Sequence, residues 1–262
     1  MAENKPNNED YFSAENERNY MSSSQFKAFL ECEAMALATI EGRYERPKTD
    51  ALLQGSYVDA HFSGEMEQFR ASNPNIFKKD GTLLSKYEIC EAVIRAVEGD
   101  QDYKDFFFSG EPQRIFTGEI AGVPFKGKVD MLYEDRIVDI KCMADIAPKW
   151  SDEERRKVPF YVLYGYHIQA AIYQELVRQA TGKTLPFYLA VVTKTDPVEK
   201  HAYQFEQGVL DATLEKVKAL APRFQAIKNH EVEPDECGKC KYYALTHRFD
   251  IFDIKTITED EM

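Results

Sequence analysis

Two short runs of alternating apolar and polar residues lie near the middle of the chain, on either side of the polar pair Glu134-Asp135. This pattern predicts a β-hairpin, and a two-residue loop is the connection that hairpins favour. The register of such a loop places Asp130 directly opposite Asp139, and Lys128 opposite Lys141. Because side chains alternate between the two faces of a strand, all four polar groups would share one face.

Two directly opposed carboxylates repel each other, so stability alone does not account for this pairing. A divalent cation between Asp130 and Asp139 would remove the repulsion, and hard oxygen ligands suit Mg²⁺ or Mn²⁺. A lysine beside such an ion, here Lys141, could orient an attacking water and stabilise the charge that develops on a phosphoryl group. The alternative is a solvent-facing hairpin with scattered charges.

The alternation continues upstream from Gln113 to Ile120, and an Ala121-Gly122 turn joins that segment to the hairpin. A two-residue turn predicts a three-stranded meander in which Gln113 lies opposite Asp130. The polar face of this meander would carry Glu119, Lys126, Lys128, Asp130, Asp139 and Lys141.

A helix and a buried strand are predicted after the meander. Helical spacing runs from Gly165 to about Thr181, with Gly182 as a C-cap, and the apolar run from Leu185 to Thr193 is typical of a buried strand. Strand, helix and strand together give a β-α-β crossover. The predicted fold class is therefore α/β (α+β), with a mixed central sheet that contains a β-meander and a β-α-β crossover and is flanked by helices.

Two further helices are predicted upstream of the sheet. Three serines at residues 22–24 can cap a helix that runs to about Ile40 and carries Cys32. A second helix covers residues 51–62, and Gly55 and Asp59 share a face of it because they are four residues apart. We expect close backbone packing at Gly55, with Asp59 directed past the glycine into a cleft. The alternative is that Asp59 is an exposed acidic residue of the helix.

A long connection between residues 143 and 165 shows little periodicity. Basic and aromatic residues are interleaved within it, which suits a groove that follows a nucleic-acid backbone and stacks bases. A solvated loop with an aromatic docking segment is the alternative. The residues concerned are Lys149, Trp150, Arg155, Arg156 and Lys157.

The composition is that of a folded chain with an acidic surface. Of its 262 residues, 44% are hydrophobic, and we expect a flexible tail over residues 1–20, one domain over 21–248 and an acidic tail over 249–262. The net charge of −12 argues against binding of nucleic acid over the whole surface, but not against a local basic channel. The odd number of cysteines and the lack of a secretory or membrane-spanning run indicate a cytoplasmic protein without a disulfide framework.

Together these features resemble the PD-(D/E)XK nuclease superfamily, in particular the phage and prophage recombination exonucleases of the RecE (exonuclease VIII) and lambda-exonuclease type. The motif of an Asp at a strand end followed by Asp/Glu-x-Lys on the next strand is matched by Asp130 and Asp139-Ile140-Lys141. The Gln-x-x-x-Tyr motif on the following helix is matched by Gln169 and Tyr173. Relatives carry a metal-binding His on an upstream helix, and Asp59 stands at that position.

The resemblance implies a restriction-endonuclease-like core and a Mg²⁺- or Mn²⁺-dependent deoxyribonuclease. Its metal ligands would be Asp59, Asp130 and Asp139, with Lys141, Gln169 and Tyr173 completing the catalytic site. The implied substrate is a double-stranded DNA end, degraded 5′ to 3′ by a homo-oligomeric ring of three or four subunits that serves a single-strand annealing protein. The alternatives are a non-catalytic DNA-binding or recombination-partner module and a structure-specific endonuclease on the same core.

The resemblance also bears on three cysteines. Some relatives bind a 4Fe–4S cluster through one N-terminal and three C-terminal cysteines, and Cys32, Cys237 and Cys240 are similar to three of these four. Tyr243 stands at the fourth position, so a standard cluster lacks one ligand. Zinc held by the three cysteines and His247 is one alternative. Reduced, unliganded thiols in a short turn are the interpretation that the sequence favours.

Overall fold

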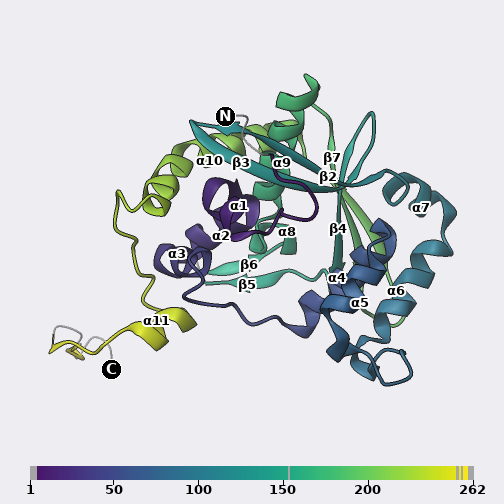
Figure 1. The fold of residues 1–262 in the computed structure, drawn as a ribbon, viewed down its shortest axis with the longest axis horizontal. Coiled ribbons are helices and arrows are strands. Elements are labelled where there is room, and N and C mark those ends of the chain that lie inside the picture. The colour runs from purple at the N-terminus through teal and green to yellow at the C-terminus, as the bar shows by residue number, and fades with distance from the viewer. Residues whose placement is uncertain (1–4, 153, 252–253, 255, 259–262) are drawn as a thin grey trace.

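A six-stranded mixed sheet forms the centre of the molecule in the computed structural model, which describes residues 5–152, 154–251, 254 and 256–258 (Figure 1). Its strands follow the order β1-β3-β4-β7-β8, and β2 pairs with β3. A separate two-stranded sheet is formed by β5 and β6. The strands are β1 (Met21–Ser22), β2 (Glu111–Ile120), β3 (Val123–Leu132), β4 (Ile137–Met143), β5 (Lys149–Ser151), β6 (Arg156–Val158), β7 (Phe187–Thr193) and β8 (Lys200–Gln204).

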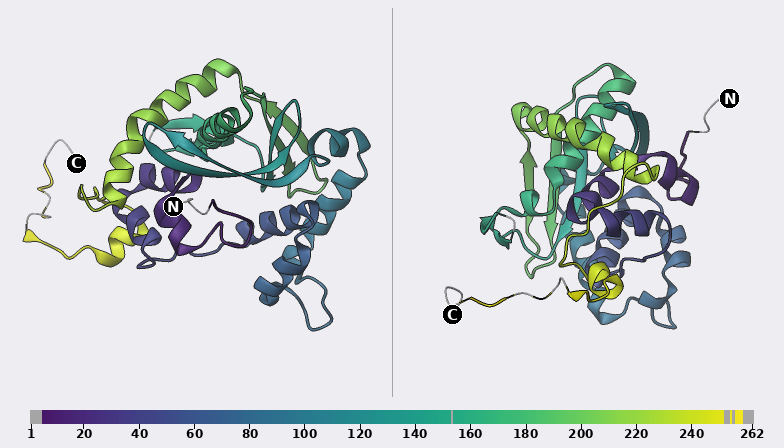
Figure 2. Two further views of the ribbon diagram at one scale, coloured as in Figure 1. Left: turned by 45° about the horizontal axis from the view of Figure 1, so that its top comes forward. Right: turned by 90° about the vertical axis from the view of Figure 1, so that its left-hand side faces the viewer.

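Helices cover both faces of this sheet, and each face has its own hydrophobic core. Helices α2, α3, α9 and α10 pack on one face, and α4, α6 and α7 pack on the other. Figure 2 shows the long β2–β3 hairpin curving beside α9, with α10 on the same side. The α-helices are α1 (Ala14–Asn19), α2 (Ser23–Glu31), α3 (Glu33–Ile40), α4 (Asp50–Ser63), α5 (Met66–Ser72), α6 (Ile89–Glu98), α7 (Gln101–Phe107), α8 (Phe160–Leu163), α9 (Tyr166–Thr181), α10 (Gln207–Lys228) and α11 (Lys241–Thr246), with short 3₁₀ turns at Pro74–Ile76 and Ser85–Tyr87.

The predicted topology is present. Strands β2 and β3 pair antiparallel around the Ala121-Gly122 turn, with Thr117 opposite Lys126 as predicted. Strands β4 and β7 are parallel, and α9 connects them, which is the β-α-β crossover. The predicted helix through Ile40 is instead two helices that meet at Cys32, where the backbone is extended with φ −166° and ψ 113°.

The N-terminal segment corrects the expectation of a tail over residues 1–20. Among its described residues, Ala14–Asn19 form α1, and Tyr11 is 5% exposed. The fully buried Lys126 fixes this segment to β3, because its Nζ donates to the Tyr11 carbonyl and lies 2.7 Å from Glu17 Oε1. Lys126 therefore serves packing and is not part of a polar site face, and Glu119 is exposed at the far end of the hairpin.

The C-terminal end leaves the body of the molecule after α11 (Figure 1). The acidic residues Glu259, Asp260 and Glu261 of the predicted tail lie outside the described residues. None of the described helices combines the length and the apolar run that crossing a membrane requires.

Candidate active site

The hairpin that carries the two central aspartates is open at its far end. Strands β3 and β4 pair beside the Glu134-Asp135 loop in the predicted register, with Met131 opposite Val138 and Leu132 opposite Ile137. The ladder then stops, because the Asp130 carboxylate accepts the Ile140 N–H through Oδ2 at 2.8 Å. The predicted direct pairing of Asp130 with Asp139 and of Lys128 with Lys141 is therefore wrong, since a side chain has taken the place of the backbone partner.

The divergence of β3 and β4 leaves room for α9. A Cβ on Gly127 would lie 3.0 Å from side-chain atoms of Tyr173 and Leu176, so only a glycine lets the helix approach β3 this closely. Strand β1 takes the edge of β3 that β4 has left, with Met21 beside Phe125. The splayed hairpin thus brings α9 and the start of α2 to the same opening in the sheet.

Asp139 is the centre of the site. It is 1% exposed, and its Oδ1 accepts a hydrogen bond of 2.7 Å from Gln169 Nε2 on α9. Its Oδ2 lies 2.5 Å from Lys141 Nζ as an ion pair, yet no group meets Oδ2 with the angles of a hydrogen bond. The structure therefore brings Asp139, Lys141 and Gln169 together and leaves one buried carboxylate oxygen without a hydrogen-bond partner.

Negative charge accumulates around this oxygen. Burial raises the pKa of Asp130 well above its usual value, and the carboxylates of Asp139 and Asp59 raise it further. Burial alone would lower the pKa of Lys141, but Asp139 and Asp130 outweigh that effect and raise it. Lys141 consequently remains an ammonium group at any physiological pH.

The third aspartate, Asp59, approaches from α4 on the other face of the sheet. Gln113 holds its carboxylate, with Nε2 at 3.0 and 3.3 Å from the two oxygens, and adopts a φ of 54° to do so. Burial raises the pKa of Asp59 to about 6, against the lowering effects of Lys141 and Lys128. The close packing expected at Gly55 is wrong, because a Cβ there would meet nothing within 4 Å.

Tyr173 follows Gln169 by one helical turn and faces the same region. Burial raises its pKa to about 12, with further contributions from Asp139 and Asp130, so the phenol stays protonated. Tyr173 and Asp130 both line a large cleft of about 1060 Å³. All the predicted catalytic side chains thus lie in one region, beside this cleft.

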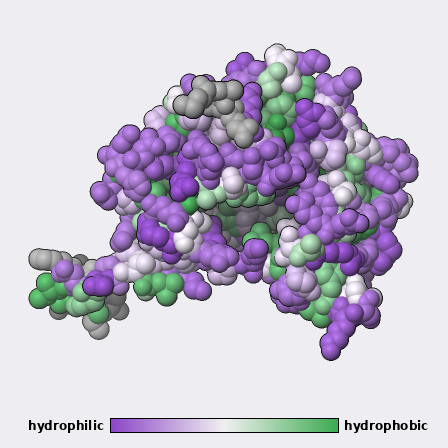
Figure 3. All heavy atoms as spheres, viewed as in Figure 1, coloured by the Kyte–Doolittle hydropathy of each residue, from purple (hydrophilic) through white to green (hydrophobic). Residues whose placement is uncertain are grey.

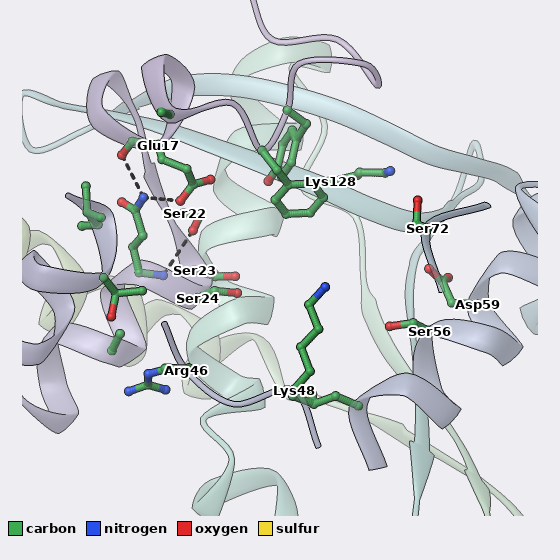
Figure 4. Close-up of a pocket in the computed structure, with 18 of the residues that line it drawn as sticks. Glu17, Ser22, Ser23, Ser24, Arg46, Lys48, Ser56, Asp59, Ser72 and Lys128 are labelled. Carbon is green, nitrogen blue, oxygen red and sulfur yellow. Dashed lines mark hydrogen bonds between the residues drawn. The ribbon is translucent and has the colours of Figure 1, made fainter. Parts of the chain in front are cut away.

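The cleft opens as a hollow in the middle of the molecular face shown in Figure 3. Ser22, Ser23 and Ser24 line one side, and Ser56 and Asp59 of α4 line the other (Figure 4). Basic side chains also line it, and Lys48 projects into the space between the two sides (Figure 4). These basic residues are Arg18, Arg46, Lys48 and Lys128.

The basic and aromatic residues predicted to bind DNA lie elsewhere, in the β5–β6 hairpin and the turn that joins its strands. None of Lys149, Trp150, Arg155, Arg156 and Lys157 is among the residues that line the cleft. Lys149 pairs with Asp145 at 2.9 Å and Arg156 with Glu154 at 3.2 Å, whereas Trp150 is 59% exposed. The cleft and this hairpin are separate candidate surfaces.

One lysine close to the site gave no signal in the sequence. Lys27 of α2 lies 5.6 Å from the centre of the Tyr166 ring, and Lys141 lies 5.2 Å from the same ring. The Lys27 Nζ donates to the Tyr164 carbonyl at 3.4 Å, and no carboxylate of the described residues lies within ion-pair distance of it. Burial and the nearby Lys141 lower the pKa of Lys27 to about 8. Only the tertiary fold places these two lysines together.

Comparison with known proteins identifies the family. Residues 22–246 match the model of a family described as a PDDEXK-like domain of unknown function (DUF3799). The chain belongs to this family. The PDDEXK-like fold confirms both the resemblance to the PD-(D/E)XK nuclease superfamily and the predicted fold class, and family and site together support a nuclease.

The PDDEXK-like chain is also similar to a solved structure from Eubacterium rectale, of a protein named as a candidate exonuclease. The two share 36% identity and a TM-score of 0.88, over 97% of this chain and 96% of the other. The structure of SSO0001 aligns over 85% of this chain and 94% of its own, at 15% identity and a TM-score of 0.30. No curated protein matches the chain significantly.

The residues of the PDDEXK-like site suit a hard divalent cation. Asp139 Oδ2 is buried without a hydrogen-bond partner, and the mutual repulsion of three carboxylates is the imbalance that such an ion relieves. The oxygens of Asp59, Asp130 and Asp139 are not all within 4.8 Å of one another, so they do not form a closed cage. An ion that keeps several waters, as Mg²⁺ does, fits an open set of this kind.

Proposed function

We propose that this protein is a Mg²⁺- or Mn²⁺-dependent deoxyribonuclease that hydrolyses phosphodiester bonds at the ends of double-stranded DNA. The observation that carries the proposal is the buried group of Asp139, Lys141 and Gln169 beside Asp130, in which Gln169 holds Oδ1 of Asp139 and, among the described residues, Oδ2 meets only the Lys141 ammonium group. A carboxylate that is 1% exposed and repels the neighbouring Asp130 carboxylate fits a metal ligand better than a purely structural aspartate.

In the proposed site the aspartates would bind the metal ion, and Lys141 would stabilise the negative charge that develops on the phosphate. Asp139 and Asp130 would hold the ion, with Asp59 as a further ligand from the facing helix. When bound, the ion would supply an activated water and polarise the scissile phosphate. Gln169 fixes the orientation of the Asp139 carboxylate through its 2.7 Å hydrogen bond, which leaves Oδ2 directed away from α9.

Lys141 would act as a permanent cation. In the metal-free protein Asp139 and Asp130 raise its pKa, so Lys141 enters the reaction as an ammonium group and not as a general base. It can instead donate hydrogen bonds to the attacking water or to the negative charge that develops on the phosphate. Tyr173, held as a neutral phenol, would donate to a phosphate oxygen or brace this side of the cleft.

Lys27 would supply a second cation for the DNA backbone. A lysine that is partly withdrawn from water gains from a nearby counter-charge, and Lys27 has no carboxylate within ion-pair distance among the described residues. A phosphate group of bound DNA would supply that counter-charge.

More specifically, we propose that the enzyme is an exonuclease of phage-type homologous recombination and digests DNA from 5′ to 3′. We propose that it works as a ring of three or four subunits and passes its single-stranded product to an annealing protein. The resemblance to recombination exonucleases supports this assignment, as does the candidate-exonuclease name of the protein from Eubacterium rectale.

End-labelled linear duplex and closed circular duplex, each incubated with the protein and Mg²⁺ or Mn²⁺, test the proposal. We expect loss of the linear DNA only, with release of the 5′ label as short products. Cutting of the circle would establish a structure-specific endonuclease instead. If wild type and Lys141→Ala both leave both substrates intact, the chain is a non-catalytic DNA-binding module.

A further inference from the structure

Three cysteines from opposite ends of the chain meet outside the nuclease site. Cys32 lies at the break between α2 and α3, and Cys237 and Cys240 lie in the segment that precedes α11. Their three sulfur atoms are all within 4.8 Å of one another. Among the described residues, this is the only such group of His, Cys, Asp or Glu ligand atoms.

The two C-terminal cysteines form a turn that directs backbone N–H groups at sulfur. The Cys240 N–H donates to Cys237 Sγ at 3.3 Å, and the Tyr243 N–H donates to Cys240 Sγ at 3.3 Å. Gly238 adopts a φ of +70° between them, a conformation that side chains disfavour. Hydrogen bonds of this kind favour a thiolate over a thiol, and thiolate is the form in which cysteine binds metals.

An ion-pair and hydrogen-bond network around the buried Glu33 holds the C-terminal turn against Cys32. Glu33, the residue after Cys32, receives two hydrogen bonds of 2.8 Å from Arg223 and a third of 2.8 Å from the Asp235 N–H. In return the Ala34 N–H donates to the Asp235 carbonyl at 3.1 Å. The contacts flanking the cysteines on both sides therefore fix the relative position of the three sulfurs, as a metal site requires.

The spacing of the sulfurs indicates a single ion. Zinc binds thiolate sulfur at about 2.3 Å, so a tetrahedral site holds its sulfurs about 4 Å apart. A cubane iron–sulfur cluster needs four cysteines, and Tyr243 stands where the fourth would be. The donor set thus does not fit the cluster that the resemblance implied.

We propose that Cys32, Cys237 and Cys240 bind one zinc ion, with a small external ligand such as water in the fourth position. The ion would tie the C-terminal segment to the α2–α3 junction and so close most of the chain into a loop. This site is separate from the carboxylate site, and the proposal does not depend on nuclease activity.

Metal analysis of the untagged full-length protein, purified anaerobically without chelator from zinc-supplemented cells, tests the proposal. We expect about one zinc ion per chain and no iron. Replacement of the zinc by Co²⁺ should produce the intense thiolate-to-cobalt absorption of a tetrahedral site. In the double variant Cys237→Ser, Cys240→Ser, zinc should fall to background, and the thermal unfolding temperature should drop.

Cys90→Ala is the matched control, because Cys90 is as buried as Cys32 but lies on α6, away from the cluster. It should retain all the zinc. The double variant changes side chains that are only partly buried, so it can be made even if Cys32→Ser does not fold. Wild-type protein without zinc, protein with iron and its visible absorption, a Cys237–Cys240 disulfide, or zinc retained in the double variant would each overturn the proposal.

Discussion

Lys141 and Lys27 lie on the same aromatic ring, but their surroundings shift their proton affinities in opposite directions. Carboxylates raise the pKa of Lys141, whereas burial and a neighbouring cation lower that of Lys27 to about 8. Each shift follows from the charges that the fold places nearby, and neither could be inferred from the sequence around the residue. The two lysines should therefore respond differently to pH and to substitution.

Lys27→Met should lower kcat/KM for linear duplex about tenfold or more, because a phosphate would lose its counter-charge. Lys27→Arg should restore most of the rate. Since the free protein loses the Lys27 charge above about pH 8, wild-type kcat/KM should decline between pH 8 and 9.5. The arginine variant should stay flat over that range because a guanidinium group remains charged. An identical decline in both proteins would contradict a role for the Lys27 charge.

The raised pKa of Asp59 predicts how the stability of the metal-free protein depends on pH. Its pKa in the folded state, about 6, lies above the value of an unfolded chain, so its charge destabilises the fold above pH 6. This cost declines as the pH falls from about 6 to about 4, the usual pKa of an aspartate in an unfolded chain. In the presence of a chelator, Asp59→Asn should therefore be more stable than wild type at pH 8 by about 1–3 kcal/mol, and this advantage should shrink to about a third of its size at pH 4.5.

Urea unfolding at the two pH values measures this difference. Addition of Mg²⁺ at pH 8 should stabilise wild type more than Asp59→Asn, because only wild type supplies the third carboxylate. A variant that is less stable than wild type at pH 8 without metal would show that Asp59 serves the fold.

At the scale of elements, the sequence predicted the helices and strands that have a regular hydrophobic pattern. It did not predict where strand pairing ends early. Alternation revealed β2, β3 and β4, and a helical run followed by an apolar run revealed the α9–β7 crossover. The early end of the β3–β4 ladder depends on the Asp130 side chain, which competes for a backbone N–H, and on a helix that packs at Gly127. Both effects are tertiary.

The polar composition of the N-terminal segment led to the wrong prediction of a flexible tail. Residues 5–20 contain few aliphatic side chains, but Tyr11 and Tyr20 are buried and Glu17 neutralises the buried Lys126. Similarly, the basic residues of the cleft come from α1, from the connection before α4 and from β3, so no local run of the sequence contains them. The one local basic run, in the β5–β6 hairpin, is partly neutralised by its own acidic residues.

Gly127→Ala tests whether the fit of α9 against β3 sets the site. The added methyl group would press on Tyr173 and Leu176, so we expect a loss of about 1–3 kcal/mol in stability and a lower cleavage rate. Gly208→Ala on α10 is the control, because a methyl group there meets nothing within 4 Å. Equal stability and activity of the two variants would show that α9 can shift without consequence.

At the scale of the whole molecule, the proposed DNA substrate would meet an acidic protein at a local basic surface. The net charge is −12, yet the cleft is lined by Arg18, Arg46, Lys48 and Lys128. Repulsion elsewhere on the surface would restrict DNA to this cleft and favour strands that enter it from an end.

Lys48→Ala should weaken DNA binding and reduce the slope of log K against log salt concentration by about 1, as expected for the loss of one phosphate contact. Arg156→Ala provides the comparison at the β5–β6 hairpin, where Glu154 already neutralises the arginine. Fluorescence anisotropy with labelled duplex at several salt concentrations measures both. A larger effect for Arg156→Ala would move the DNA path to the hairpin.

The most direct test of the proposed catalytic site is single-turnover cleavage of linear duplex DNA by wild type and by Lys141→Met, with excess protein and Mg²⁺. Loss of the permanent cation beside Asp139 should lower the rate about 10²-fold or more, while DNA binding changes little. Chelation of the metal should abolish cleavage by wild type. A Lys141→Met protein that cleaves at the wild-type rate would contradict the assignment of this site as the catalytic centre.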